Sequence, residues 1–108
     1  ITPAIESMRE RGVAVEGPFP ADGFFAHGAY KEYDGIVAMY HDQGLIPLKL
    51  LAQGAGVNLT AGLPLVRTSP DHGTAFAIAG KNIADARSTM QAIALAAQIV
   101  EHRHHSRS

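Results

Sequence analysis

Side chains able to bind an anionic substrate follow one another at regular intervals from residue 41 onward. His41 and Asp42 come directly after an apolar run, and Lys49, Asn58 and Arg67 follow at intervals of 8, 9 and 9 residues. An imidazole can ligate a divalent metal, with the neighbouring carboxylate as a second ligand or as the group that orients the ring. Arginine offers phosphate a planar fork, and lysine a compact charge. The pattern predicts part of an active site.

Each of these residues also has a purely structural interpretation. His41 can cap the helix that follows it, with Asp42 in the first turn. Lys49 can extend along a helix face, and Asn58 can point outward from an edge strand. A single histidine does not make a metal site, so further ligands must come from elsewhere. The residues alone leave both interpretations open.

Two other segments carry side chains that can do chemistry. Asp22 can act as a general acid or base, or it can cap a short helix. A polar loop can hold a nucleotide through backbone amides at a helix N-terminus, or it can form an Asx-type turn with a cap. This loop consists of Asp71, His72, Gly73 and Thr74. Neither a GxGxxG fingerprint nor a Walker-type loop is present in the sequence.

Composition indicates a globular protein and excludes some classes of partner. Of the 108 residues, 46% are hydrophobic and 18% charged, which is typical of a globular core. The net charge is −1 and the basic residues are scattered, so nucleic acid and membrane surfaces are not expected partners. No apolar run approaches the roughly 18 residues of a membrane span, and we expect a cytoplasmic protein. The chain opens on Ile1, which suggests a fragment of a longer protein.

Hydrophobic spacing and turn residues predict alternating helices and strands, hence the α/β class. Helices are expected from an N-cap at Thr2 to Gly12, from Ala21 to Phe25, and over 43–53, with one or two helical turns over 73–78. Strands are expected over 13–15, 35–40, 57–60 and 65–67, and residues 27–33 are expected to be loop.

The last helix has the clearest signals. Ser88 and Gln91 fit a capping box. An apolar stripe follows it, made of Met90, Ile93, Ala94, Ala97 and Val100. Residues 1–101 are therefore expected to form the folded portion, and residues 102–108 a polar tail that frays.

The motifs in this chain closely resemble those of the 4-hydroxythreonine-4-phosphate dehydrogenase family of vitamin B6 (pyridoxal 5'-phosphate) biosynthesis. The resemblance runs from the first helix to about Val100, without a gap between His41 and Arg67, and it covers the C-terminal portion of such a protein. It is carried by Gly17–Asp22, Met39–Leu45 with Lys49, Gly56–Asn58, Gly62–Pro64, Arg67–Ser69 and Asp71–Ala75.

The resemblance implies a fold and a set of partners. The fold would be the layered α/β/α architecture of isocitrate and isopropylmalate dehydrogenases, in a homodimer with a shared active site. His41 would be one of three histidines that hold zinc, magnesium or cobalt. The phosphorylated substrate would be bound by Lys49, Asn58 and Arg67. The catalytic carboxylates Asp22 and Asp42 would line the same pocket.

The resemblance also implies a reaction. The loop from Asp71 to Thr74 would bind NAD or NADP, and 4-phosphohydroxy-L-threonine would be oxidised with decarboxylation to 3-amino-2-oxopropyl phosphate. Gly23 stands where the family usually has threonine, and Ala61 where it usually has leucine. These departures leave room for relatives' substrates, phospho-threonate or cis-dihydrodiol carboxylates. A non-catalytic metal- or phosphate-binding module is the remaining alternative.

Overall fold

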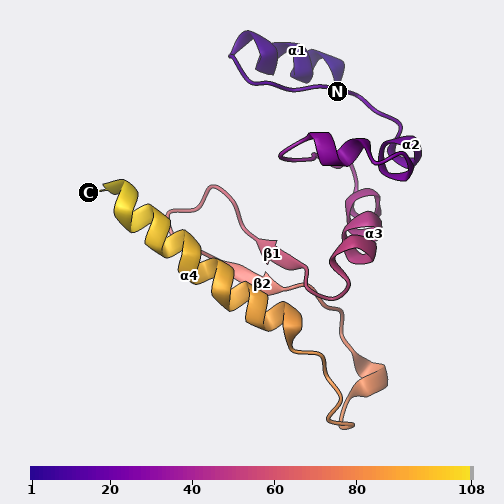
Figure 1. Ribbon diagram of the computed structural model, residues 1–108, viewed down its shortest axis with the longest axis vertical. Helices are drawn as coiled ribbons and strands as arrows, with labels where there is room; N and C mark the ends of the chain where they lie inside the picture. Colours follow the sequence, from indigo (N-terminus) through magenta and orange to yellow (C-terminus); the bar gives the residue numbers. More distant parts are fainter. Residues whose placement is uncertain (108) are drawn as a thin grey trace. The chain divides into compact units, whose positions relative to one another are not determined.

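The computed structural model describes residues 1–107, which divide into two compact units, residues 1–44 and residues 45–107. We call these units 1 and 2 and treat each by itself. The elements follow in the order α1 (Thr2–Glu10), α2 (Ala21–Ala26), η1 (Ala29–Glu32), α3 (His41–Ala52), β1 (Val57–Leu59), β2 (Thr68–Pro70), η2 (Phe76–Ile78) and α4 (Arg87–Arg107) (Figure 1).

The two predicted helices at the start of unit 1 are confirmed, but their caps differ from the prediction. Thr2 is already the first helical residue of α1 and Ile1 occupies the cap position. In α2 the cap is Pro20, so Asp22 lies within the first turn and its Oδ1 accepts the Gly23 N–H at 2.8 Å. A carboxylate in the first turn is favoured by the positive end of the helix dipole. The predicted loop 27–33 contains the short helix η1.

The predicted strands 13–15 and 35–40 are wrong, because their backbones bond to helices instead of to other strands. The Arg9 Nε donates to the Val15 carbonyl at 2.9 Å. The Met39 N–H donates to the Gln43 Oε1 at 2.7 Å, at the start of α3. Neither segment has a partner strand within unit 1, so neither apolar run forms a strand.

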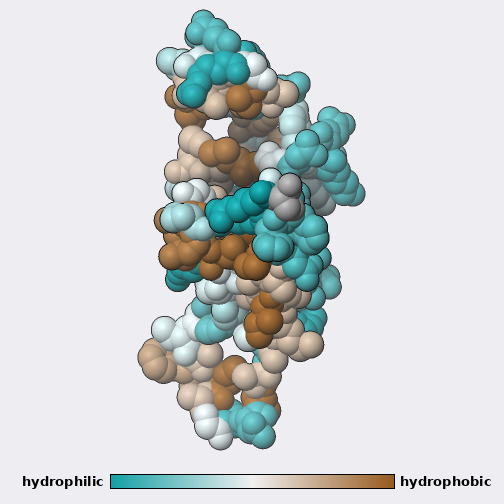
Figure 2. All heavy atoms as spheres, turned by 90° about the vertical axis from the view of Figure 1, so that its left-hand side faces the viewer, coloured by the Kyte–Doolittle hydropathy of each residue, from teal (hydrophilic) through white to brown (hydrophobic). Residues whose placement is uncertain are grey.

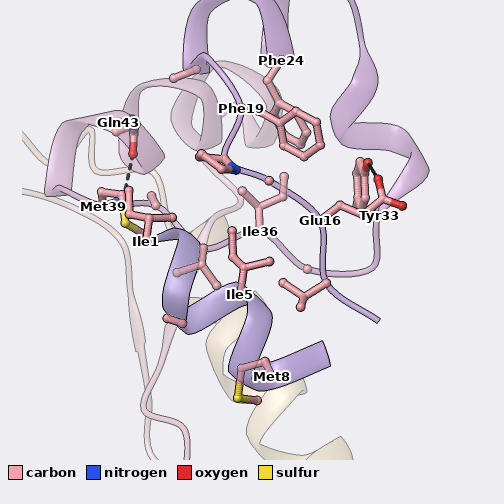
Figure 3. Close-up of a pocket in the computed structure, with 18 of the residues that line it drawn as sticks. Ile1, Ile5, Met8, Glu16, Phe19, Phe24, Tyr33, Ile36, Met39 and Gln43 are labelled. Carbon is pink, nitrogen blue, oxygen red and sulfur yellow. Dashed lines mark hydrogen bonds between the residues drawn. The ribbon is translucent and has the colours of Figure 1, made fainter. Parts of the chain in front are cut away.

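Unit 1 contains an apolar groove of about 530 Å³, lined by α1, α2 and residues of the segments 14–19 and 35–39 (Figure 3). Phe19 stacks on Phe24 with ring centroids 5.2 Å apart, and Tyr33 lies 5.8 Å from Phe24. The Tyr33 hydroxyl donates to Glu16 Oε2. This hydrogen bond raises the pKa of Tyr33 above its ordinary value, because it stabilises the neutral phenol.

Unit 2 is built on a two-stranded antiparallel sheet with α4 packed against it (Figure 1). The prediction of a strand over 57–60 is confirmed for Val57–Leu59. The predicted strand 65–67 is wrong, because β2 begins three residues later at Thr68. Before β2, the carbonyls of Leu63 and Pro64 accept hydrogen bonds from Arg103 Nη1 on α4, at 3.2 and 3.1 Å.

The face that α4 turns toward the sheet is not the predicted one. Met90, Ile93 and Val100 from the predicted stripe are 65%, 67% and 55% exposed. The buried residues of α4 are Ser88 and Ala92, one turn apart. The small side chains at these two positions let the helix backbone approach the sheet closely.

The predicted cap of the last helix is also wrong, whereas the polar tail over residues 102–108 stays a prediction. The helix begins at Arg87, so Ser88 is inside it, and its hydroxyl donates to the Gly56 carbonyl instead of capping. The helix continues to Arg107 through the segment expected to fray. The Ser106 hydroxyl donates to the His102 carbonyl at 2.8 Å one turn earlier.

An ion pair marks the start of α4 and gives a testable pH dependence. Arg87 hydrogen-bonds Asp85 through its side chain, at 2.6 Å from Nη2 to Oδ2, and through its backbone N–H, which lowers the pKa of Asp85 from 3.8 to about 2. Because the folded pKa is the lower one, the contribution to stability is present above pH 3.8 and is lost as the pH falls through about 2.

We therefore expect Arg87→Gln to return the pKa of the Asp85 carboxyl toward 3.8, because the guanidinium that stabilises the carboxylate is gone. An NMR titration that follows the Asp85 side-chain carbon measures this directly. An unchanged low pKa in the variant would contradict the assignment of the shift to Arg87.

Across residues 1–107 the chain is mostly helical with one small sheet. This agrees with a mixed helix and strand class, whereas the layered α/β/α architecture is not formed by these residues themselves. Many apolar side chains stay at the surface, seen as brown areas in Figure 2. Among the described helices, none combines the length and the apolar character that crossing a bilayer requires.

Candidate functional site

Asn58 and Arg67 lie on the same face of the β1–β2 ladder. Asn58 is paired with Ser69, and the Thr60 N–H donates to the Arg67 carbonyl at 3.1 Å, which extends the ladder by one pair. Residues that are directly opposite share a face, as do residues two apart along a strand. Arg67 Nη1 accordingly donates to the Thr60 hydroxyl at 3.1 Å.

The opposite face of the ladder packs against α4. Thr68 follows Arg67 and therefore points the other way, and its hydroxyl donates to the Ala92 carbonyl at 2.8 Å. The helix thus lies against the face of the ladder that carries Thr68. Asn58 and Arg67 are directed away from α4, and both are exposed.

Asp71 and Lys49 extend this polar face. The register that pairs Val57 with Pro70 places Gly56 opposite Asp71. A Cβ at Gly56 would lie 3.2 Å from Asp71 Oδ2, so the carboxylate lies directly against the glycine. Lys49 Nζ, from α3, is 3.9 Å from Asp71 Oδ1, with the Lys49 side chain 54% exposed and that of Asp71 20% exposed.

We call Lys49, Asn58, Arg67 and Asp71 the anion face. The first three offer two positive charges and an amide, which are the donors that phosphate and carboxylate ligands take. The ion pair between Lys49 and Asp71 is partly exposed and contributes at most about 1 kcal/mol to stability. Its significance is positional, because it holds one cation of the face near the end of the ladder.

His41 and Asp42 form a hydrogen-bonded pair at the start of α3, in unit 1. His41 Nδ1 lies 2.7 Å from Asp42 Oδ1, and the two side chains are 79% and 70% exposed. An imidazole whose Nδ1 bonds a carboxylate presents its Nε2 outward, which is the arrangement found for histidines that ligate metals. Gln43, next in the helix, fixes the preceding segment through the Met39 N–H.

His41 fits a metal as one ligand with Asp42 as its orienting partner. Among residues 1–107, however, no group of three or more histidine, aspartate or glutamate side chains is placed to hold an ion. Any further ligands would have to come from outside the described residues. Asp22 is exposed, and its Oδ1 accepts the Gly23 N–H, which leaves Oδ2 as the oxygen available to a substrate.

The residues of the predicted nucleotide loop make contacts with different parts of the chain. Asp71 is turned toward Lys49, so its carboxylate belongs to the anion face. His72 Nδ1 lies 2.9 Å from the Gly73 carbonyl, a local contact. Ala75 then adopts a left-handed conformation with φ 54° as the cap of η2. For Asp71, His72, Gly73 and Thr74 alike, a role in cofactor binding stays a prediction.

The most informative residue missed by the sequence reasoning is Ser88. The motif around it fits a capping box, which hides its buried position and its bonds to the ladder. The spacing of Ser88 and Ala92 at i and i+4 is a signal that could have found it, because two small residues one turn apart often mark a close helix contact.

Comparisons with known proteins point to a single protein family. The family model described as pyridoxal phosphate biosynthetic protein PdxA matches residues 1–96. A "4-hydroxythreonine-4-phosphate dehydrogenase" of Bacteroides thetaiotaomicron is 55% identical over 103 residues, which are 95% of this chain and 28% of that protein. A "D-threonate 4-phosphate dehydrogenase" of Cupriavidus necator is 54% identical over 103 residues, 95% of this chain and 31% of that protein.

A solved structure agrees with these sequence matches. The crystal structure of a 4-hydroxythreonine-4-phosphate dehydrogenase from Burkholderia phymatum matches with a TM-score of 0.62 and 52% identity, over 85% of this chain and 28% of that one. The chain therefore spans less than a third of the length of these relatives.

Proposed function

Because the chain belongs to the pyridoxal phosphate biosynthetic protein PdxA family, we propose that the whole protein oxidises 4-phosphohydroxy-L-threonine with NAD or NADP. Loss of carbon dioxide from the oxidised acid would give 3-amino-2-oxopropyl phosphate. The observation that carries this proposal is the anion face, where the register of β1 and β2 brings Asn58 and Arg67 to one side. A relative that is 55% identical bears the matching enzyme name.

In this proposal the anion face binds the substrate phosphate. The Arg67 guanidinium and the Asn58 amide donate hydrogen bonds to phosphate oxygens, and Lys49 adds a second positive charge. The phosphate lies away from the carbon that is oxidised. Binding it therefore fixes the orientation of the reacting groups without changing their chemistry.

The pair of His41 and Asp42 serves the reacting end of the substrate in the whole protein. His41 Nε2 would hold a zinc, magnesium or cobalt ion together with ligands beyond the described residues, while Asp42 Oδ1 keeps the ring oriented through Nδ1. Such an ion, when bound, stabilises negative charge on the substrate oxygen. Asp22 Oδ2 is the oxygen that would accept or return a proton.

A second substrate is supported by the comparisons. The Cupriavidus necator relative, at 54% identity, is named for D-threonate 4-phosphate, which carries the same phosphate on a different acid. Gly23 and Ala61, which depart from the motifs that the family usually has, could adapt the pocket to either substrate. The anion face would serve either substrate equally, so the choice between them depends on groups around the acid.

The experiment is an assay of NAD(P)H formation by the whole protein, with 4-phosphohydroxythreonine and D-threonate 4-phosphate given separately, with and without a chelator. We expect turnover of the first substrate at the higher kcat/KM, and its loss when the chelator removes the metal. A higher kcat/KM for the threonate would move the proposal to the second substrate. Turnover of neither would overturn both.

We further propose that the whole protein is a homodimer. The exposed apolar residues Met90, Ile93 and Val100 on α4 support this, because such a stripe is stable in water only when it is covered. Sedimentation equilibrium of the whole protein should give twice the mass of one chain. A monomer at micromolar concentration would contradict the proposal.

A further inference from the structure

The hydroxyl of Ser88 lies between the two strands at one end of the β1–β2 ladder. The Thr60 N–H bonds the Arg67 carbonyl, and hydrogen-bonded pairs in an antiparallel ladder alternate with non-bonded ones. Counting back along the register, the pair formed by Gly56 and Asp71 falls at a hydrogen-bonded position. Pro70, which has no N–H, falls at a non-bonded position, as the alternation requires.

At this pair the backbone groups meet through Ser88. The Asp71 N–H donates to Ser88 Oγ at 2.8 Å, and the same hydroxyl donates to the Gly56 carbonyl at 2.5 Å. A hydroxyl can do both at once because it carries one donor and two acceptor lone pairs. Ser88 is only 6% exposed, so water does not readily replace it. One side chain of α4 therefore joins the start of β1 to the end of β2.

The residue held by this bridge is the counter-ion of Lys49. The Ser88 bond fixes the backbone of Asp71, and the missing side chain of Gly56 leaves room for its carboxylate. The carboxylate is then directed to Lys49, 3.9 Å away. The Ser88 hydrogen bond and the space left by Gly56 thus fix Asp71 in unit 2. The exposed Lys49, by contrast, has a long, flexible side chain that is otherwise costly to order.

We propose that Ser88 is a positioning residue, which holds Asp71 so that its carboxylate keeps Lys49 in place on the anion face. The inference rests on the proposed function in one respect, the assignment of Lys49 to phosphate binding. Ser88 itself touches no substrate. Its effect reaches the site only through the backbone of Asp71.

The structural part of the test is amide hydrogen exchange of Asp71, measured by NMR in the whole protein. Ser88→Ala should speed this exchange by at least about fivefold, because the Asp71 N–H loses the hydroxyl that accepts its hydrogen bond, and a fivefold change corresponds to about 1 kcal/mol. Ser88→Thr keeps the hydroxyl and should restore protection. Ser106→Ala, the same change at an exposed site on α4, should leave Asp71 unaffected.

The functional part is the affinity for inorganic phosphate, measured by calorimetry, so that it does not depend on turnover. Ser88→Ala should weaken binding about fivefold, since Lys49 must then be ordered by the ligand. Thr68→Val removes the other hydroxyl bond between the ladder and α4 without touching Asp71, and it should change the affinity little.

The mechanism predicts that Ser88→Ala has no further effect on phosphate affinity once Asp71→Asn is present. Additive effects of the two changes would overturn the proposal, and so would equal losses in Ser88→Ala and Thr68→Val. Gly56→Ala, which places a Cβ 3.2 Å from Asp71 Oδ2, supplies the same test if Ser88→Ala fails to fold. Phosphate binding without dehydrogenase turnover would count against the proposed function and leave the role of Ser88 standing.

Discussion

Replacing Arg67 with methionine is expected to lower kcat/KM for 4-phosphohydroxythreonine by about 10²- to 10³-fold, because charge-assisted bonds to phosphate are each worth about 1.5–3 kcal/mol. Most of the loss should appear in KM, since the phosphate binds equally in the ground state and the transition state. Methionine keeps the length of the side chain and its apolar part. Steady-state kinetics of NAD(P)H formation by the whole protein measures the change.

Two variants make the Arg67 result specific. Arg67→Lys keeps the charge but loses the planar fork, and we expect it to recover only part of the affinity. Arg107→Met removes an equal charge from the exposed end of α4 and should leave both kinetic constants unchanged. Wild-type KM and kcat in Arg67→Met would remove Arg67 from the phosphate site.

His41→Ala is expected to abolish metal-dependent turnover and to lower the metal content of the purified protein. The imidazole would supply a ligand through Nε2, and the remaining ligands cannot replace it. Asp42→Asn should have a smaller effect, about 10- to 100-fold in metal affinity, because it acts on the orientation of the ring. Metal analysis after dialysis gives a readout that is separate from activity.

The control for this prediction is another exposed histidine of unit 1. His27 follows α2 as its C-cap, and His27→Ala should change neither the metal content nor the turnover. A His41→Ala protein that keeps its full complement of metal would show that the metal lies elsewhere. Turnover that survives in such a protein would place His41 in the structural role of starting α3.

Local signals in the sequence predicted the helices well and the strands poorly. α1, α2, α3 and α4 each coincide with a predicted helix, because helical hydrogen bonds are made within one segment. A strand depends on a partner, and the apolar run 35–40 has none in unit 1. The first of the two strands of unit 2 was placed correctly because it alternates. In β2, by contrast, Ser69 and Pro70 follow Thr68 and carry little strand signal.

The residues of the candidate site could be predicted from the sequence, but their arrangement could not. Chemistry-bearing residues could be picked out by type and spacing, as with Arg67 and Asn58, but their common face follows only from the register of two strands. Asp71 was predicted to touch a nucleotide, and its pairing with Lys49 depends on where α3 ends. The buried bridge at Ser88 was hidden by a local motif, since a capping box and a small-residue contact need similar residues.

Recognition of the substrate phosphate by the anion face is tested most directly by comparing 4-phosphohydroxythreonine with 4-hydroxythreonine that lacks the phosphate. In the wild-type whole protein, kcat/KM should favour the phosphorylated acid by at least about 10³-fold, as two charge-assisted contacts to phosphate imply. The same preference should largely disappear in Arg67→Met. Equal kcat/KM for the two acids in the wild-type protein would contradict the account, because the substrate phosphate would then contribute nothing to binding.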